Sequence, residues 1–165
     1  MKELKPIIDV CCGGKMFHCD KDNPDVLFMD IRKEPAQKLS NGATFSVQPD
    51  IIGDFRNIPF PNDTFYMVIF DPPHLRCGEK SFLFKKYGTL NTDWRHTIKR
   101  GFEECFRVLK PFGTLVFKWS DSFQPLSKVL ELCPAEPIIT YASKSQSKKK
   151  KTHFLIFMKK ENKNK

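Results

Sequence analysis

The four consecutive residues Asp71-Pro72-Pro73-His74 carry groups that are suited to hold an amine. They follow the apolar run at 64–70, so we expect them at the end of a buried strand. The amino group on a nucleobase ring is a weak nucleophile, because its lone pair is delocalised into the ring. The Asp71 carboxylate and the Pro72 carbonyl could accept its two hydrogens, while the prolines keep the backbone rigid. The flat ring of His74 could stack on the base, although a stiff turn after a strand is the simpler explanation.

Acidic residues end four successive apolar runs, at Asp9, Asp30, Asp54 and Asp71. The carboxyl ends of parallel strands meet at one edge of a sheet, where open α/β sheets bind their ligands. Asp30 lies 21 residues after Asp9, a spacing typical of a carboxylate that holds ribose hydroxyls beyond a glycine-rich turn. The Gly13-Gly14 turn lacks the full glycine pattern of dinucleotide-binding proteins. This combination favours a ligand of the nucleoside type that has no pyrophosphate.

Apolar runs alternate with segments of helical periodicity, which predicts an α/β fold with a mostly parallel sheet and a C-terminal antiparallel hairpin. The runs are continuously apolar, as in strands that are covered on both faces. We expect strands at 6–10, 25–30, 50–54, 64–71, 114–119, 138–141 and 153–158, and helices at 93–109 and 123–132. The first helix is expected to end at a turn at 111–113. Little regular helix is expected at 31–49, and 75–92 is expected to be a long irregular loop.

Three stretches resemble the class I S-adenosylmethionine-dependent methyltransferases, in the order in which that family has them. Residues 7–14 resemble its first motif, 53–65 the segment that reads the adenine, and 104–115 the helix, turn and fifth strand. The resemblance covers nearly the whole chain. It implies a Rossmann-like sheet, S-adenosylmethionine as cofactor, a single methyltransferase domain at 1–160 and a basic tail at 161–165.

The same resemblance implies which residues bind the cofactor, all of them at strand ends. They are Asp9, Val10, Cys11, Cys12, Gly13, Asp30, Ile31, Asp54, Phe55 and Asp71. Within this set, the residues after the first strand would line the methionine part. Those after the second strand would bind the ribose, and those after the third would contact the adenine.

The stretch Asp71-Pro72-Pro73-His74 also resembles the (Asp/Asn)-Pro-Pro-aromatic motif of amino-methyltransferases. These enzymes act on the exocyclic nitrogens of adenine, cytosine or guanine, or on a glutamine side chain. The resemblance implies catalytic roles for Asp71, Pro72, Pro73 and His74, with N6 of adenine as the favoured target. Histidine stands here at a position where Tyr, Phe or Trp is commoner.

The formal charge of the chain is +9, and residues 143–165 carry +8 of it. Such a concentration indicates a polyanionic partner, most simply nucleic acid, although a solubilising tail is an equal alternative. The cations that we expect to contact a phosphate backbone are Lys85, Lys86, Lys148, Lys149, Lys150 and Lys151. The mixture of aromatic and basic residues at 75–92 suits base stacking, or an ordinary loop whose rings fold back on the core. The chain has no room for a separate recognition domain, so specificity would be low, would rest on a structured RNA, or would come from a partner.

Two other function classes stay open: methyl transfer to a protein side chain or small molecule, and a nucleic-acid-binding module without catalysis. The lysine run disfavours the first, and the intact Asp71-Pro72-Pro73 disfavours the second.

The six cysteines are expected as reduced thiols, and their spacing fits no standard zinc pattern, so no metal is expected. No apolar stretch is long enough to span a membrane and no signal peptide is recognisable, so we expect a soluble cytoplasmic protein. The choice between DNA and RNA and the oligomeric state stay open.

Overall fold

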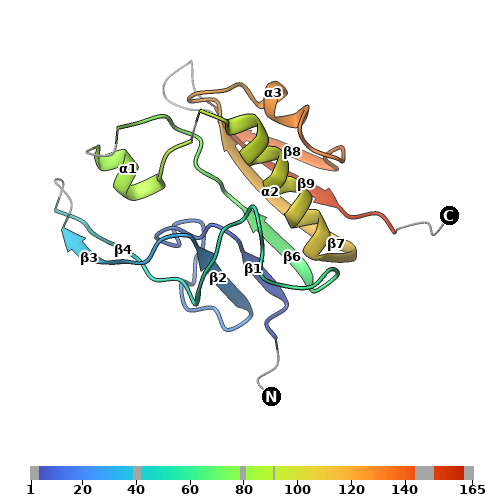
Figure 1. Ribbon diagram of the computed structural model, residues 1–165, viewed down its shortest axis with the longest axis horizontal. Helices are drawn as coiled ribbons and strands as arrows, with labels where there is room; N and C mark the ends of the chain where they lie inside the picture. The colour runs from blue at the N-terminus through green and yellow to red at the C-terminus, as the bar shows by residue number, and fades with distance from the viewer. Residues whose placement is uncertain (1–3, 39–41, 79–80, 91, 144–150, 162–165) are drawn as a thin grey trace.

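The computed structural model describes residues 4–38, 42–78, 81–90, 92–143 and 151–161. Its seven-stranded sheet has the order β5-β2-β1-β6-β7-β9-β8 (Figure 1). The strands are β1 (Ile7–Asp9), β2 (Val26–Asp30), β5 (Ile51–Ile52), β6 (Phe65–Phe70), β7 (Leu109–Ser120), β8 (Ile139–Ser143) and β9 (Thr152–Met158). Strands β5, β2, β1, β6 and β7 are parallel neighbours, whereas β9 pairs antiparallel with both β7 and β8. The predicted mostly parallel α/β sheet with a C-terminal antiparallel hairpin is therefore confirmed.

The direction in which the chain fills the sheet reverses beside β1. From β1 the chain moves outward to β2 and then to β5, and it next crosses to β6 on the other side of β1. A crevice forms outside the carboxyl ends of two strands whose connections leave in opposite directions. The ends of β1, β2 and β6 therefore bring Asp9, Asp30 and Asp71 to one edge of the sheet.

Helix α2 (Trp94–Val108) covers one face of the sheet (Figure 1). Ile98 and Phe102 lie four residues apart on its inner side, and both are fully buried. The ring centroid of Phe102 lies 4.8 Å from that of Phe117 and 5.6 Å from that of Phe70. These contacts hold the helix against β6 and β7, the two strands that follow the switch in direction.

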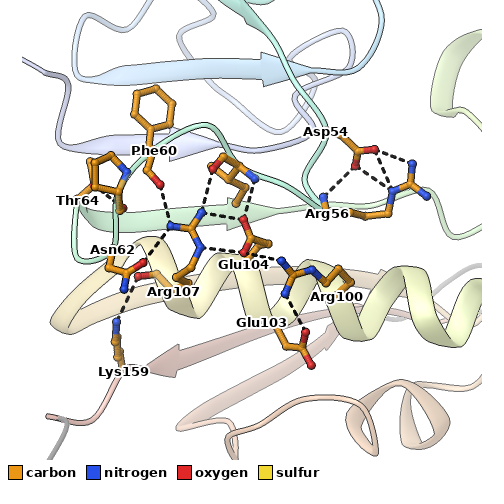
Figure 2. Close-up of polar contacts among 12 residues, drawn as sticks. Asp54, Arg56, Phe60, Asn62, Thr64, Arg100, Glu103, Glu104, Arg107 and Lys159 are labelled. Carbon is orange, nitrogen blue, oxygen red and sulfur yellow. Dashed lines mark hydrogen bonds and ion pairs between the residues drawn. The ribbon is translucent and has the colours of Figure 1, made fainter.

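The side chains of Glu104 and Arg107 on α2 bind the segment that enters β6, as Figure 2 shows. Glu104 Oε2 accepts hydrogen bonds from Arg107 Nη2 at 2.7 Å and from the backbone nitrogen of Ile58 at 2.8 Å. Arg107 also donates to the carbonyl oxygens of Ile58 and Phe60 and to Asn62 Oδ1. This network satisfies the backbone of a segment that has no ladder partner, and so it holds the chain that follows Asp54 in place.

Loss of the charge of Glu104 should lower stability in a pH-dependent way. Hydrogen bonds from Arg107 hold the pKa of Glu104 below its ordinary value of 4.5. A lowered folded-state pKa gives a stabilisation that is complete above the unfolded-state pKa and is lost as pH falls through the folded-state pKa. We expect Glu104→Gln to lower the free energy of unfolding at neutral pH by about 2 kcal/mol and to flatten its decline below pH 4.5.

Urea denaturation, repeated from about pH 7 down to about pH 3, measures this effect. The matched control is Glu103→Gln on the same helix, because the Glu103 side chain is 43% exposed in its pair with Arg100. That exposed pair should contribute at most about 0.5 kcal/mol. Equal losses for the two variants would contradict the assigned role of the Glu104 network.

Two elements occur where the sequence predicted irregular chain. The stretch 31–49 contains an antiparallel hairpin of β3 (Glu34–Lys38) and β4 (Thr44–Val47). The stretch 75–92 contains the short helix α1 (Phe82–Tyr87). Strand β3 is mostly polar and α1 is only six residues long, so neither produces the apolar periodicity on which the prediction relied.

Two other boundaries differ from the prediction. Helix α3 (Leu126–Leu130) is shorter than the expected 123–132, because Pro125 occupies the cap position in extended conformation. Strand β7 begins directly after α2, so the expected turn at 111–113 lies within the strand. The chain turns at Phe112, whose φ of 62° lies in the left-handed region. The pairing of β6 with β7 is irregular next to this turn.

The face of the sheet opposite α2 is only partly covered over the half of the sheet that β7, β9 and β8 form. Side chains alternate between the two faces of a strand, so Val116 points away from α2 while Phe117 packs against it. On the same face as Val116, the side chains of Ile139, Tyr141 and Met158 are 54%, 64% and 43% exposed. The prediction that the strands are covered on both faces is therefore wrong for this half of the sheet.

Candidate active site

A cavity of about 490 Å³ opens at the edge of the sheet where β1, β2 and β6 end. This volume lies within the range of about 300–1,000 Å³ that is typical of small-molecule sites. All residues predicted from strand ends and motifs line it: Asp9, Val10, Cys11, Cys12, Gly13, Asp30, Ile31, Asp54, Phe55, Asp71, Pro72, Pro73 and His74. Helix α1 and the end of β7 complete the walls. The fold thus gathers into one cavity residues that are far apart in the sequence.

The Asp30 carboxylate joins the turn after β1 to the end of β2. Its Oδ2 accepts a hydrogen bond from the backbone nitrogen of Gly13 at 2.8 Å, and its Oδ1 accepts one from the backbone nitrogen of Arg32 at 2.9 Å. Gly13 has a φ of +49°, a conformation that favours glycine. Oδ1 also accepts from Arg32 Nε at 3.3 Å, so the lone pair left on this carboxylate, which is 3% exposed, belongs to Oδ2. This lone pair can accept a hydrogen bond from a ligand in the cavity.

Asp9 and Cys11 form the wall of the cavity at the end of β1. Asp9 Oδ2 lies 2.7 Å from Nε2 of His18, and its Oδ1 accepts a hydrogen bond from the backbone nitrogen of Cys11. Burial raises the pKa of Asp9, and the hydrogen bond to His18 offsets only part of that rise. Burial, together with the charge of Asp9, also raises the pKa of the Cys11 thiol. The thiol therefore stays protonated and serves as an apolar surface of the cavity.

The two oxygens of the Asp71 carboxylate differ in their surroundings. Its Oδ2 lies 2.5 Å from Nζ of Lys118 on β7. Its Oδ1 is buried, and within the part of the chain that the structure describes it has no hydrogen-bond partner. Nδ1 of His74 lies 3.9 Å from Oδ1, which is beyond hydrogen-bond distance. A buried unpaired carboxylate oxygen is unfavourable unless a donor reaches it, so Oδ1 is the atom here that most needs a ligand.

The ring of His74 is held in one orientation beside that carboxylate. Its Nδ1 lies 3.2 Å from the carbonyl oxygen of Pro72, and because a carbonyl can only accept, the hydrogen is on Nδ1. The ring centroid lies 6.1 Å from that of Trp119 and 6.4 Å from that of Tyr87. Burial lowers the pKa of His74, against the opposing charge of Asp71. The imidazole is therefore neutral at neutral pH, and Pro72 keeps one lone pair for a further donor.

Asp54 and Phe55 form the wall beyond β5. The guanidinium of Arg56 closes on the Asp54 carboxylate, with Nη2 2.6 Å from Oδ2 (Figure 2). Partial burial would raise the pKa of Asp54, but the hydrogen bonds and charge of Arg56 outweigh it and hold the pKa below its ordinary value. The Phe55 ring meets that of Phe70 edge to face, with centroids 5.1 Å apart. This corner of the cavity offers an aromatic wall beside a fixed carboxylate.

The lysines predicted for nucleic-acid binding are only partly described. Lys86 lines the cavity, with its Nζ 5.1 Å from the ring centroid of Tyr87. Lys151 is exposed just before β9, outside the cavity. Lys148, Lys149 and Lys150 and the side chain of Lys85 lie outside the described residues, so their predicted role stays a prediction.

Several residues of the cavity were not predicted from the sequence. The chief one is Lys118. It is a charged residue in an otherwise apolar strand, and this unusual charge is the feature of the sequence that could have marked it as a site residue. Phe17 also lines the cavity, and Nζ of Lys118 lies 5.6 Å from its ring centroid. His18, the residue after Phe17, pairs with Asp9, which lines the cavity. The contact of Lys118 with Asp71 joins segments that are far apart in the sequence, whereas His18 lies only nine residues after Asp9.

The described residues contain neither a metal-binding cluster nor a membrane-spanning helix. No group of three or more His, Cys, Asp or Glu side chains among them is placed to hold a metal ion. None of the helices in the described ranges has the length and apolar character required to cross a membrane.

The solved structures to which this chain is similar share one fold. No protein-family model matches the sequence, and no curated protein matches it. Among solved structures, a SAM-dependent methyltransferase from Methanosarcina mazei has a TM-score of 0.61 at 14% identity, over 97% of this chain and 94% of that one. The PH0226 protein from Pyrococcus horikoshii OT3 has a TM-score of 0.61 at 16% identity, over 97% and 84%.

A third neighbour carries a bound molecule. It is the N-methyltransferase NodS from Bradyrhizobium japonicum WM9 in complex with S-adenosyl-L-homocysteine, with a TM-score of 0.56 at 12% identity over 94% of this chain and 78% of that one. At such identities the likeness shows a shared fold. The sheet of this chain is thus the Rossmann-like sheet of the class I methyltransferase fold.

Proposed function

We propose that this protein transfers a methyl group from S-adenosylmethionine to an exocyclic amino nitrogen of a nucleobase in nucleic acid, with N6 of adenine favoured. The single observation that carries this proposal is the buried Asp71 Oδ1, which lacks a partner within the described residues and lies at a strand end in the wall of the cavity. An amino group is the complementary donor, and the adjoining Pro72 carbonyl has a lone pair for a second hydrogen.

The residues present fit S-adenosylmethionine as cofactor. Asp30 Oδ2 can accept from a ribose hydroxyl with the lone pair that Gly13 leaves unused, while Arg32 occupies Oδ1. Phe55 and Asp54 offer a flat wall and acceptors for the adenine, and Asp9, Val10, Cys11, Cys12 and Gly13 border the remaining space for the methionine part. NodS, which shares the fold, was solved with the demethylated product of this cofactor. When bound, the cofactor supplies an electrophilic methyl group.

The residues of the site would act on the amine in three ways. Asp71 Oδ1 and the Pro72 carbonyl accept its two hydrogens, which localises the lone pair on nitrogen. The amine nitrogen forms the new N–C bond while the S–C bond breaks, and the product nitrogen then releases one proton to water. The neutral His74 ring keeps Pro72 fixed through its Nδ1 hydrogen and offers a flat surface to the base. No protein group needs to remove the proton, because a methylated ammonium is acidic.

The proposal of a nucleic-acid substrate rests on the positive charge of the chain and on which bases could enter the cavity. The chain carries +9 overall, and Lys86 borders the cavity itself. A base paired inside a duplex cannot enter such a site, so the substrate would be a single strand or a base turned out of its helix. A protein side chain or a small molecule as methyl acceptor is the rival hypothesis.

Tritium transfer from labelled S-adenosylmethionine to RNA, DNA, bulk protein and free adenosine tests the proposal, which predicts label in nucleic acid and none in protein.

Replacement of Lys118 should impair turnover without emptying the site. Lys118 Nζ holds Asp71 Oδ2 at 2.5 Å and so directs Oδ1 to its position. We expect Lys118→Met to lower kcat by roughly 10- to 100-fold, the effect of a small misplacement of a reacting group, with an unchanged KM for S-adenosylmethionine. Lys118→Arg keeps the charge and should recover part of the rate. A normal kcat for Lys118→Met would contradict the positioning role.

A further inference from the structure

From the open face of the sheet, we infer a track for single-stranded nucleic acid that leads from β8 to the cavity. Its members are Tyr141, Phe154 and Phe17, and its ligand would be the bases that flank the target nucleotide. The inference rests on the proposed nucleic-acid substrate and adds where the strand lies. The strands that carry the track, β7, β9 and β8, are neighbours in the sheet, and β8 is its edge strand (Figure 1).

The pairing register places the members of the track side by side. Lys118 on β7 lies opposite Phe154 on β9, and Phe154 lies opposite Tyr141 on β8. Residues directly opposite each other point to the same face of a sheet. The ring centroids of Tyr141 and Phe154 are 6.4 Å apart, and those of Phe154 and Phe17 are 5.9 Å apart. The interplanar angles are 38° and 32°, so the three rings form a continuous, slightly tilted row.

The row ends at the catalytic candidate. Phe17 lines the cavity, and Lys118 Nζ, 5.6 Å from its centroid, pairs with Asp71. A strand whose target base occupies the cavity would therefore have its neighbouring bases beside Phe17 and then Phe154. Tyr141 is two strand spacings from Lys118, roughly 10 Å at the usual distance between strands.

Exposure and charge indicate what covers this face. Tyr141 is 64% exposed and Ile139 is 54% exposed, and contiguous apolar surface of this kind usually marks a binding site. Five lysines fall between β8 and β9 in the sequence: Lys144, Lys148, Lys149, Lys150 and Lys151. Of these, Lys151 lies within the described residues and is exposed. Aromatic rings together with cations are the combination that binds single strands, with bases on the rings and phosphates at the cations. A second copy of a +9 chain would instead bring like charges together.

Binding of a labelled strand tests the track. The probe is a fluorescein-labelled adenine-rich RNA or DNA strand of about 12 nucleotides, within the site sizes of about 4–16 nucleotides that single-strand binding folds show. Fluorescence anisotropy should show that Tyr141→Ala weakens binding about tenfold, the loss expected for one stacked base. Tyr141→Phe should restore it. Phe154→Leu, which keeps apolar volume but removes the ring, should weaken binding as Tyr141→Ala does.

Tyr66→Ala is the matched control. Tyr66 is 62% exposed on β6, and Lys110 Nζ lies 3.8 Å from its ring centroid, so it is an aromatic residue beside a cation but outside the track. Its replacement should leave binding unchanged. Affinity for S-adenosylhomocysteine, measured by calorimetry, should be the same in all four variants.

The outcomes separate this inference from the proposed function. If the wild type binds and methylates the strand but Tyr141→Ala behaves as Tyr66→Ala does, the track is wrong and the proposed function stands. If the wild type binds neither RNA nor DNA, both are wrong. If sedimentation shows that Tyr141→Ala turns a dimer into a monomer at unchanged strand affinity, the face pairs two copies and the track is overturned.

Discussion

Replacing Asp71 with alanine should lower methyl transfer to nucleic acid by about 10²- to 10³-fold, the loss found when one preorganised electrostatic contact to a reacting group is removed. The reason is the buried Oδ1, which in our account takes one hydrogen of the substrate amine. The variant also leaves Lys118 without the carboxylate that it now holds at 2.5 Å. Single-turnover transfer of labelled methyl groups measures the chemical step without product release.

The cofactor and the fold should survive this change. Affinity for S-adenosylhomocysteine should be little altered, because this thioether carries no sulfonium charge. Asp25→Ala, at an exposed aspartate before β2, is the control and should keep full activity. Asp71→Asn keeps an acceptor oxygen but loses the charge that pairs with Lys118, so its rate should lie between those of the wild type and Asp71→Ala. Full activity of Asp71→Ala would contradict the assigned chemistry.

Replacing Asp30 with alanine should abolish measurable cofactor binding. Asp30 has two tasks in our account: it holds Gly13 and Arg32 through hydrogen bonds of 2.8 Å and 2.9 Å, and it accepts from the ribose. Loss of a buried charged acceptor leaves these donors unsatisfied at about 1–3 kcal/mol each. Together with the loss of the ribose contacts, this corresponds to a decrease in affinity of at least about 100-fold. Isothermal calorimetry with S-adenosylhomocysteine measures it.

A cofactor analogue separates the two tasks of Asp30. S-adenosylhomocysteine that lacks the ribose 2′-hydroxyl should bind the wild type more weakly than the full compound. In Asp30→Asn, which keeps an oxygen for Gly13, the two compounds should bind with nearly equal affinity. If Asp30→Asn still discriminates between them as the wild type does, the ribose is held elsewhere and Asp30 serves only the turn.

The sequence predicted which strand ends converge on one cavity better than it predicted the elements around them. Asp9, Asp30, Asp54 and Asp71 could be found because each ends an apolar run, and carboxyl ends of parallel strands must converge. Their convergence depends only on strand order, so errors in element boundaries did not affect it. For the same reason, Asp54 lines the cavity as predicted although β5 has only two residues.

Contacts between distant segments could not be read from the sequence. Lys118 appeared as one charge in an apolar run, and only the pairing of β7 with β6 brings it to Asp71. The network of Glu104 and Arg107 likewise joins α2 to residues more than 40 positions earlier. The open face of the sheet was missed because a continuously apolar strand was assumed to be covered on both sides. Tyr141 shows that apolar side chains alone do not establish a cover.

The measurement that tests the central claim most directly is mass spectrometry of nucleosides from RNA and DNA strands incubated with the protein and S-adenosylmethionine. The account predicts a methylated amino nucleoside, with N6-methyladenosine or its deoxy form favoured, in the wild-type reaction and about 10²- to 10³-fold less of it with Asp71→Ala. Methyl groups found only on ring carbons, on ribose or on protein, or found equally with both proteins, would contradict it.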